Sequence, residues 1–503
     1  AYITLIYFII LKNINNKLLS FIPFKEIKYN KNMTKQEIIK LLDNSINPVN
    51  YNYNSDEIKS ILNGYFQAEG HIGGYFSNKQ SVTFNPLVFI SQNASIESIK
   101  LFKIMNYEFN NELKYNIYKL NSGEWHIKIL SKNWNIIINK WIPYFNNTYG
   151  DKYIGLQMLL KIYYLYYSEF GKSNKYTKYN FNHVDNAIKR IFLIYNLIDN
   201  SQRNLSPIEK FNIWINNKNI YYFDGDNLIT SNTNNQDIIN KINYDYYNKY
   251  IEEIKLNLFL KCKNNFKLDF LFIHGFYLGD GSFNIIISSS NNLLWYIPNL
   301  RISQKMTIYN IELFNIIIKY LSTLNINSKI KLLKNETMIE FSIESQASIK
   351  AYSRLLLNYP NYYFNKEDQI YFLIQASKLF GKIKIWKDGQ IALLKLIYNY
   401  QFGNVHNLSN FNYNIVNKLI LTELNNHISH INNYFDDKKI SDMYYITIYK
   451  NNKYKVKLPI NISPSEKYFN FNLDKSEALL KAKNYRNTTL NKWLLDNNFN
   501  YYY

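Results

Sequence analysis

Apolar and polar residues recur with two different periods along the first third of the chain. The stretch SDEIKSILNGYF (55–66) places apolar side chains three and four residues apart, and Ser55 or Asp56 can cap the helix that this spacing predicts. The period then shifts toward two in HIGGYF and SVTFNPLVFISQ, as in strands. A helix (SIESIKLFKIMNYE), a hairpin that turns at Asn121-Ser122-Gly123 and a further helix (NWNIIINKWIPYF) follow. The pattern predicts the order α-β-β-α-β-β-α.

The same order recurs in the second half of the chain. SFNIIISSS and WYIPNLRISQ have the pattern of strands, and YNIELFNIIIKYLSTL has that of a helix. SKIKLLKN and TMIEFSIES form a predicted hairpin, and QASIKAYSRLLLNY a predicted helix. The spacing agrees as well, because 83 residues separate Glu69 from Lys152 and 86 separate Asp280 from Lys366. The repetition indicates a duplicated α+β domain.

These patterns divide the chain into six segments. They are an N-terminal extension (1–50), a first domain (54–197), an inter-domain connection (198–265), a second domain (266–402), a linker (403–440) and a small module (441–498). The module is expected to contain three short strands, YYITIYK, KYKVKLP and YFNFNL, followed by a helix that Asp474 can cap.

A short motif recurs at the start of each domain. LNGYFQAEGHIGG (62–74) and IHGFYLGDGSFNI (273–285) each place small residues four apart, which puts them on one helix face. These small residues are Gly64, Ala68, Gly275 and Gly279. Faces without bulky side chains let two helices approach closely. The acids that end the two helices, Glu69 and Asp280, would then converge.

Two converging carboxylates have a chemical explanation that a structural role lacks. An acid at a helix C-terminus opposes the helix dipole, so a helix-end role gives Glu69 and Asp280 no stability rationale. The two would repel each other unless cations lay between them, and hard oxygen ligands suit Mg²⁺. Acids and a divalent metal beside a phosphate-binding surface form the arrangement for phosphodiester hydrolysis.

With these residues in place, the chain resembles the LAGLIDADG homing endonucleases and maturases of organellar introns, over roughly residues 54 to 400. The resemblance implies two pseudo-symmetric αββαββα domains with saddle-shaped antiparallel sheets in a monomer. It implies that Glu69 and Asp280 bind Mg²⁺, with Mn²⁺ as a substitute. Gln67 and Leu278 stand at the motif's earlier acidic position, which is not a metal ligand. Lys152 and Lys366 match the lysines that face the metal-site water, although solvated surface lysines are the alternative.

The resemblance also implies that each sheet lies along a major groove of double-stranded DNA. Polar strand residues that point away from the core are the candidates for base contacts. They are His71, Gly73, Tyr75, Gln80 and Gln92 in the first half, and Ser282, Asn284, Arg301 and Gln304 in the second. Strand alternation alone does not decide which parity faces the DNA.

Composition is consistent with a nucleic-acid partner. The 503 residues carry a formal net charge of +21, which attracts polyanions, although a bias toward A/T-rich codons would also enrich lysine. A single cysteine, Cys262, excludes a disulfide framework and a cysteine-based zinc site. AYITLIYFIIL at the start is too short to span a bilayer, so no stable membrane partner is expected; it could be an upstream remnant, a signal-like remnant or a buried helix.

Near the end, Lys450, Lys453, Lys455 and Lys457 give the small module a resemblance to sheet-plus-helix DNA-binding modules of the AP2 or integrase-arm kind, with a packing appendage as the alternative.

Three functions remain open at this point. The first is an intron-encoded, Mg²⁺-dependent endonuclease that makes a double-strand break at a long asymmetric site, and the intact acids favour it. The second is an RNA maturase that assists splicing of a group I intron, and the third is a non-catalytic component of an organellar ribonucleoprotein. The family and the composition together imply a mitochondrial matrix location.

Overall fold

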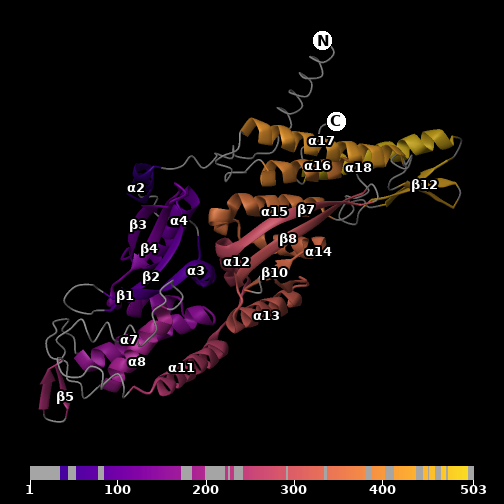
Figure 1. Ribbon diagram of the computed structural model, residues 1–503. Coiled ribbons are helices and arrows are strands. Elements are labelled where there is room, and N and C mark those ends of the chain that lie inside the picture. The colour runs from indigo at the N-terminus through magenta and orange to yellow at the C-terminus, as the bar shows by residue number, and fades with distance from the viewer. Residues whose placement is uncertain are drawn as a thin grey trace.

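The computed structural model describes residues 34–43, 53–76, 84–170, 184–198, 221–224, 227–230, 242–290, 293–333, 337–380, 387–402, 413–437, 446–450, 452–458, 466–471 and 474–496. Two halves meet at a central pair of helices, α3 (Ser55–Glu69) and α12 (Phe270–Asp280), and a small third unit follows (Figure 1). Each half contains one four-stranded antiparallel sheet. The α+β fold class predicted from the sequence is confirmed.

The first half builds its sheet from two hairpins. After α3 come β1 (Gly70–Phe76), β2 (Phe84–Asn93), α4 (Ile96–Glu108), β3 (Lys114–Lys119), β4 (Trp125–Ser131), α5 (Trp134–Ile136), the π-helix η2 (Ile137–Trp141), α6 (Ile142–Tyr144), α7 (Asp151–Phe170) and α8 (Val184–Ile198). The strands pair in the order β1-β2-β4-β3. A short helix, α2 (Lys35–Asp43), lies ahead of them in the chain and buries Ile38.

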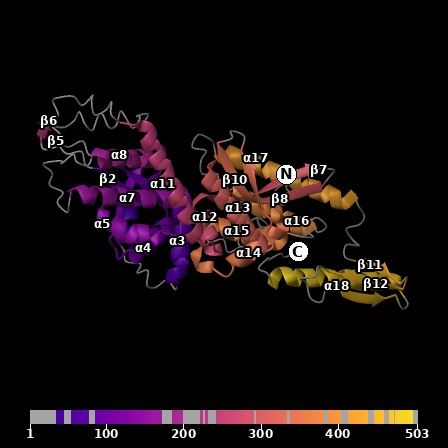
Figure 2. The ribbon, with the colours of Figure 1, turned by 90° about the horizontal axis from the view of Figure 1, so that it is seen from below.

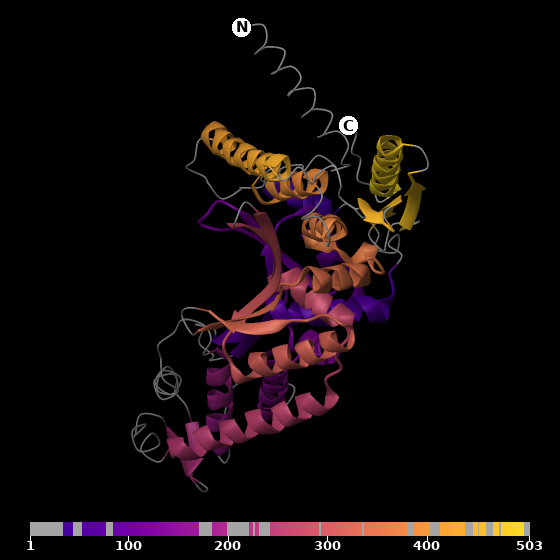
Figure 3. The ribbon, with the colours of Figure 1, turned by 90° about the vertical axis from the view of Figure 1, so that its right-hand side faces the viewer.

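The second half repeats this arrangement. After α12 come β7 (Gly281–Ser290), β8 (Leu293–Lys305), α13 (Ile308–Thr323), β9 (Lys329–Leu332), β10 (Met338–Ile343), α14 (Gln346–Leu356), the 3₁₀ helices η4 (Pro360–Tyr362) and η5 (Phe364–Lys366), α15 (Glu367–Leu379), α16 (Lys387–Ile397) and the π-helix η7 (Tyr398–Phe402). The strand order β7-β8-β10-β9 matches that of the first half. Figure 3 shows how strongly the long strands β7 and β8 bend.

Two segments outside the repeat carry structure of their own. The predicted connection contains a small hairpin, β5 (Tyr221–Asp224) with β6 (Asn227–Thr230), and the long helix α11 (Tyr244–Asn265). The stretch 403–440, predicted as a linker, contains α17 (Tyr413–Asp437). Ile431 of α17 is buried in the main core, and Leu424 and Ile428 pack against that core, so α17 extends the second half.

The central helices begin at well-formed caps. The side chain of Asn54, rather than Ser55 or Asp56, accepts from the amides of Asp56 and Glu57 at 2.8 and 3.4 Å. In the other half Asp269 accepts from the amide of Phe272 at 2.7 Å. These caps satisfy amides that the first turn of a helix leaves without partners.

The two central helices touch through their backbones. A Cβ atom added at Gly64 would overlap the carbonyl of Phe272, and one added at Gly275 would overlap the carbonyl of Ile61. Further along, a Cβ at Gly279 would collide with the Cβ of Ala68. The structure therefore brings together the four small residues that the sequence places on one helix face, and nothing larger fits at the crossing.

Polar contacts on both sides of the crossing hold the halves together. Tyr362 donates to Glu57 at 2.7 Å and accepts from the amide of Asn54 at 3.1 Å. Asn147 donates from its side chain to the carbonyl of Lys267 and accepts from the amide of Lys267, both at 2.9 Å. Each half thus contacts the cap or the approach of the other half's central helix.

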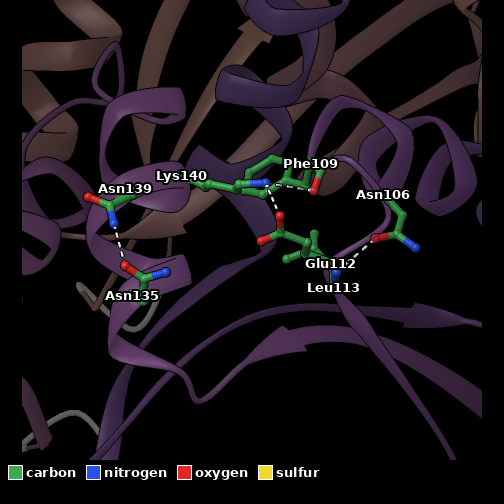
Figure 4. A network of polar contacts seen from close by, with 7 residues as sticks. All are labelled: Asn106, Phe109, Glu112, Leu113, Asn135, Asn139 and Lys140. Carbon is green, nitrogen blue, oxygen red and sulfur yellow. Dashed lines mark hydrogen bonds and ion pairs between the residues drawn. The ribbon is translucent and has the colours of Figure 1, made fainter.

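A polar network fixes the turn from α4 into β3 (Figure 4). Lys140 of η2 donates to Glu112 at 2.6 Å and to the carbonyl of Phe109 at 3.3 Å. Asn106 accepts from the amide of Leu113 at 2.9 Å. These contacts set the direction in which the second hairpin of the first sheet leaves α4.

The small third unit has its own core. It contains β11 (Ile446–Tyr449), β12 (Lys453–Lys457), β13 (Glu466–Asn470) and α18 (Lys475–Asp496), with the strands paired in chain order. Figure 2 shows it set apart from the helices of the second half. The three strands and one helix predicted for the module are present. No helix among the described residues is long and apolar enough to cross a membrane.

Candidate active site at the paired helix ends

The two motif acids lie at the ends of the central helices. Glu69 is the last residue of α3 and Asp280 the last of α12, and the backbone becomes extended at the glycine that follows each acid. Because α3 and α12 cross in contact, the carboxylates lie close enough for the charge of Asp280 to raise the pKa of Glu69. The convergence inferred from the motif is present in the structure.

The surroundings of both carboxylates disfavour ionisation and so raise their pKa values. Burial, and then the charge of Asp280, raise the pKa of Glu69 above its ordinary value. Burial also raises the pKa of Asp280, while a hydrogen bond from Gln304 and the nearby lysines oppose the rise. Two partly buried like charges form a site that gains from a bound cation.

Each acid receives a hydrogen bond from a glutamine of its own sheet. The amide of Gln92 in β2 donates to Glu69 at 2.6 Å, and the amide of Gln304 in β8 donates to Asp280. Sequence reasoning proposes these two glutamines as base contacts, which stays a prediction. In the structure their amides orient the carboxylates, and only the matching offset from acid to glutamine, 23 and 24 residues, could have signalled this.

In each half, a lysine reaches the backbone carbonyl of the glycine that follows the motif acid. Lys152 at the start of α7 donates to the carbonyl of Gly70, and Lys366 in η5 donates to the carbonyl of Gly281. Burial lowers the pKa of Lys152, and burial lowers that of Lys366 to about 8. Both lysines are therefore partly buried next to the acids, in contrast to the solvated surface lysines of the alternative interpretation.

The turns that present these lysines share an unusual backbone conformation. Gly150 has φ +54° and Phe364 has φ +41°, and each stands two residues before its lysine. A bulky residue rarely adopts positive φ, and such strain concentrates at functional sites. Sequence reasoning missed this feature, because glycine in one copy and phenylalanine in the other do not look equivalent.

Comparisons with known proteins agree with this geometry. The family model described as LAGLIDADG endonuclease matches residues 273–377, which contain Asp280, Gln304 and Lys366. This match lies within the second half. Because the first half repeats its element order, its acid, its glutamine and its lysine, the resemblance of the chain to the LAGLIDADG family is confirmed.

Solved structures of LAGLIDADG homing endonucleases are similar to the chain at low identity. I-LtrWI bound to target DNA is 15% identical, with 69% of this chain and 98% of that chain covered and a TM-score of 0.47. I-GzeII in complex with its DNA target is 17% identical, with 68% and 97% covered and a TM-score of 0.44. Similarity at this level carries no argument about activity. A comparison with proteins of curated function found no match.

The two motif acids fit a divalent cation of the oxygen-binding kind. Glu69 and Asp280 are hard oxygen donors, and the described residues contain no group of three or more histidine, cysteine, aspartate or glutamate side chains that could enclose a metal. Mg²⁺ is commonly held by one or two carboxylates together with water and substrate phosphates. Two acids without a third protein ligand among the described residues therefore suit Mg²⁺ better than a metal that needs a closed protein cage.

The first sheet has a covered face and an open face. Val88 and Ile90 of β2 are fully buried under the helices, and the register pairs them with Ile72 and Gly70 of β1. The opposite side, called the first open face, carries the three candidates His71, Gly73 and Tyr75. Gln92 has the parity of the covered face, and Gln80 lies outside the described residues.

Aromatic rings and lysines dominate the first open face. The Lys128 ammonium lies 3.9 Å from the ring centre of Phe89, whose ring centre is 4.4 Å from that of His71. Lys132 lies 5.2 Å from the ring centre of Tyr75. Burial lowers the pKa of His71 to about 4, so its imidazole is neutral near pH 7. A hollow of about 1040 Å³ at the outer end of this sheet is lined in part by Lys114, Lys128 and Lys132.

The second LAGLIDADG sheet is organised in the same way but carries different side chains. Phe283 and Ile285 are buried on its covered face, so Ser282 and Asn284 lie on the second open face, as does Arg301 by its pairing with Ser282. Arg301 donates to Ser282 at 2.9 Å and lies 3.5 Å from a carboxylate oxygen of Glu340. Gln304 has the parity of the covered face.

The outer part of the second open face is apolar, which sequence reasoning did not predict. Ile286 and Ile297 are paired across β7 and β8 and are 48% and 42% exposed, and Trp295 two residues along is 45% exposed. Exposed large apolar side chains that cluster on one face commonly mark a contact surface.

Proposed function

We propose that this chain is a DNA endonuclease that hydrolyses one phosphodiester bond in each strand of a double-stranded target, with Mg²⁺ at the paired acids. The observation that carries the proposal is the convergence of Glu69 and Asp280, each with its own glutamine and its own partly buried lysine. A duplicated set of groups suits a substrate with two antiparallel strands. No purely structural role accounts for two like charges held together at the end of a helix crossing.

Glu69 and Asp280 would hold the cation, with further ligands from water and from DNA phosphates. Bound there, Mg²⁺ would lower the pKa of a water and stabilise the leaving oxygen. Gln92 and Gln304 hold the carboxylates in place by donating to them. With a pKa of about 8, the Lys366 amine can accept a proton from water near neutral pH, and its charged form can offset negative charge on a phosphate.

The two open faces supply the binding surface in this proposal. Each sheet would lie in a major groove on one side of the cleavage site, since grooves of B-DNA admit β-structure and expose base edges. The halves carry different side chains on these faces, so the two half-sites would differ in sequence. We further propose that the target is an intron-free organellar allele and that the protein acts in the mitochondrial matrix as a monomer.

The test is cleavage of a library of intron-free organellar DNA in Mg²⁺. We expect a discrete double-strand cut by the wild type and a loss on the order of 10³-fold in Glu69→Gln and in Asp280→Asn. Glu253→Gln is the matched control, because Glu253 is exposed on α11. Folded wild-type protein that cuts nothing in Mg²⁺ or Mn²⁺ would contradict the proposal, and faster splicing of a group I intron RNA by the same preparation would then establish the maturase.

A further inference from the structure

The small C-terminal unit presents one covered and one open sheet face. Ile446, Tyr454 and Val456 are buried against α18, together with Ala478 and Ala482 of that helix. This cluster is separate from the main core. The unit therefore stabilises its own sheet from one side and does not need the other side for folding.

The register defines what the open side carries. One row across the sheet consists of Thr447, Lys455 and Tyr468, and the next consists of Tyr449, Lys453 and Asn470. Tyr449 is 38% exposed and Tyr468 is 44% exposed. We call this surface, together with Lys450 in the turn and Lys457 at the strand end, the module face.

Charge on this unit is strongly one-sided. Residues 446–496 contain ten lysines and arginines and four acids. Glu466 is the one acid within the three strands, and it is already paired with Lys455 at 2.9 Å and with Lys457 at 3.6 Å. The module face therefore carries positive charge in excess of what its acid can balance.

The aromatic residues on the module face support the lysines. The Lys455 ammonium lies 5.8 Å from the ring centre of Tyr449 and 5.4 Å from that of Tyr468. The two rings meet edge to face at 5.3 Å and so do not form a parallel platform for unpaired bases. A face with lysines and hydroxyl groups but no flat stacking surface suits the phosphate backbone of a duplex.

We propose that the module face is a second DNA-binding surface, which contacts the phosphates of duplex DNA flanking the cleaved site. The proposal rests on the proposed function, because the two LAGLIDADG halves would bring flanking DNA to the module at a high effective concentration. Lys450, Lys453 and Lys457 contact phosphates, and the hydroxyl of Tyr449 donates to them, whereas the hydroxyl of Tyr468 donates to Glu466 at 3.4 Å. This contact adds affinity without sequence preference and lengthens the protected site.

The experiment compares two duplexes that carry the cleavage site. One ends where the two sheets end, and the other is longer by about two helical turns on each side. We expect the wild-type full chain to bind the longer duplex about tenfold more tightly, as measured by fluorescence anisotropy in Ca²⁺. The triple variant Lys450→Gln/Lys453→Gln/Lys457→Gln should lose this gain, and the slope of log affinity against log salt should fall by about 0.9 for each lost contact.

The control variant removes the same charge from the helix side of the module. Lys475→Gln/Lys481→Gln/Lys492→Gln should keep the full gain from the longer duplex. Equal affinity of the wild type for both duplexes would overturn the proposal, as would an equal loss in the control variant. If Lys450→Gln/Lys453→Gln/Lys457→Gln instead lost only the binding of group I intron RNA, the module face would be an RNA-binding surface and the proposal would be wrong.

The same samples separate this inference from the proposed function. Cleavage of the short duplex by the wild type and by both triple variants tests the proposed endonuclease activity, because this duplex is too short to reach the module. If the short duplex is cut equally by all three proteins and length has no effect on binding, only the module proposal fails. If nothing is cut, the proposed function fails. The affinities of Lys450→Gln/Lys453→Gln/Lys457→Gln and of the control variant for non-specific duplexes of both lengths then still test the module face.

Discussion

The two halves are nearly equivalent where their central helices meet and differ most at the outer ends of their sheets. Near the crossing, each half supplies an acid, a glutamine and a lysine in matching contacts. Farther out, the first open face carries Lys128 and Lys132 against aromatic rings. The second open face pairs its arginine with Glu340 and ends in exposed Ile286 and Trp295.

Under the proposed function, this difference separates catalysis from DNA recognition within one molecule. Cutting two strands requires two equal sets of groups, which a duplicated motif provides. Recognition has no such requirement, so the lysines of the first open face favour phosphate contacts, whereas an apolar face favours base edges that carry methyl groups. The comparison predicts that substitutions in the backbone contact between the central helices affect both halves together, whereas substitutions of a side chain that serves one half affect that half.

The largest expected effect comes from the crossing itself. Gly64→Ala would force a Cβ against the carbonyl of Phe272, so we expect destabilisation by about 3 kcal/mol, although alanine ordinarily favours a helix. Urea unfolding measures the change, and cleavage of both strands should be lost together. Gly73→Ala is the control, since the nearest atom to its Cβ would be the His71 side chain at 3.3 Å. A stable, active Gly64→Ala protein would show that the backbones do not touch.

Next in size is the effect of removing one lysine. If the pseudo-two-fold axis relates Lys152 to Lys366, then Lys152→Met and Lys366→Met should each slow the cutting of one strand by on the order of 10²-fold, and the two variants should nick opposite strands. Strand-specific end labels on the target duplex distinguish these products. Lys161→Met on the exposed side of α7 should cut both strands normally. Equal loss on both strands in either variant would show that the halves do not act independently.

The outer apolar patch predicts a preference for thymine methyl groups in the second half-site. Replacing thymine by uracil there should weaken wild-type binding by about 0.8 kcal/mol for each buried methyl, and Ile286→Ser/Ile297→Ser should not distinguish the two bases. Anisotropy with matched duplexes measures the difference. Lys128→Gln on the first open face is the comparison, because it should weaken binding to all sequences alike and reduce the salt dependence. If the wild type bound the thymine and uracil duplexes equally tightly, the apolar patch would have no role in base recognition.

The smallest effect concerns stability without metal. In EDTA the raised pKa values of Glu69 and Asp280 mean that the folded protein binds more protons than the unfolded chain between the unfolded and folded pKa values. The free energy of unfolding should therefore fall as pH rises through this window, which begins near the ordinary values of 3.8 and 4.5.

Neutralising the acids should remove that penalty. At pH 7, Glu69→Gln and Asp280→Asn should each be more stable than the wild type by about 0.5 to 1 kcal/mol after solvent screening, and the gain should vanish at acidic pH. Chemical denaturation at pH 4 and pH 7 checks the sign. A gain in only one variant would show that the two halves hold their acids differently, and a loss in both would show that the carboxylates stabilise the fold.

The sequence was sufficient to predict features that repeat. The two acids, the small residues at the crossing and the order of helices and strands along the chain recur at nearly constant spacing, so each copy supports the other. Features without a repeat were harder to predict. Phe364 adopts the positive φ that Gly150 adopts in the other half, and nothing in its residue type indicates this.

Competing local choices account for the remaining differences. Asn54 caps α3 although Ser55 and Asp56 are equally good capping types, since position relative to the first turn decides among them. Parity was also beyond the sequence, because Gln92 and His71 are both polar strand residues. Only the pairing of β1 with β2 shows that one lies beside the acids and the other on the open face.

The backbone contact between α3 and α12 also governs how such a protein can change over generations. The spacing of the two motif acids is set by main-chain atoms, whose positions do not depend on which side chains the sheets carry. Under the proposed function, a lineage can therefore replace the side chains of an open face and recognise a new target sequence without changing the distance between the two acids. Substitutions should then be tolerated least at the glycines of the crossing and most at the outer strand residues.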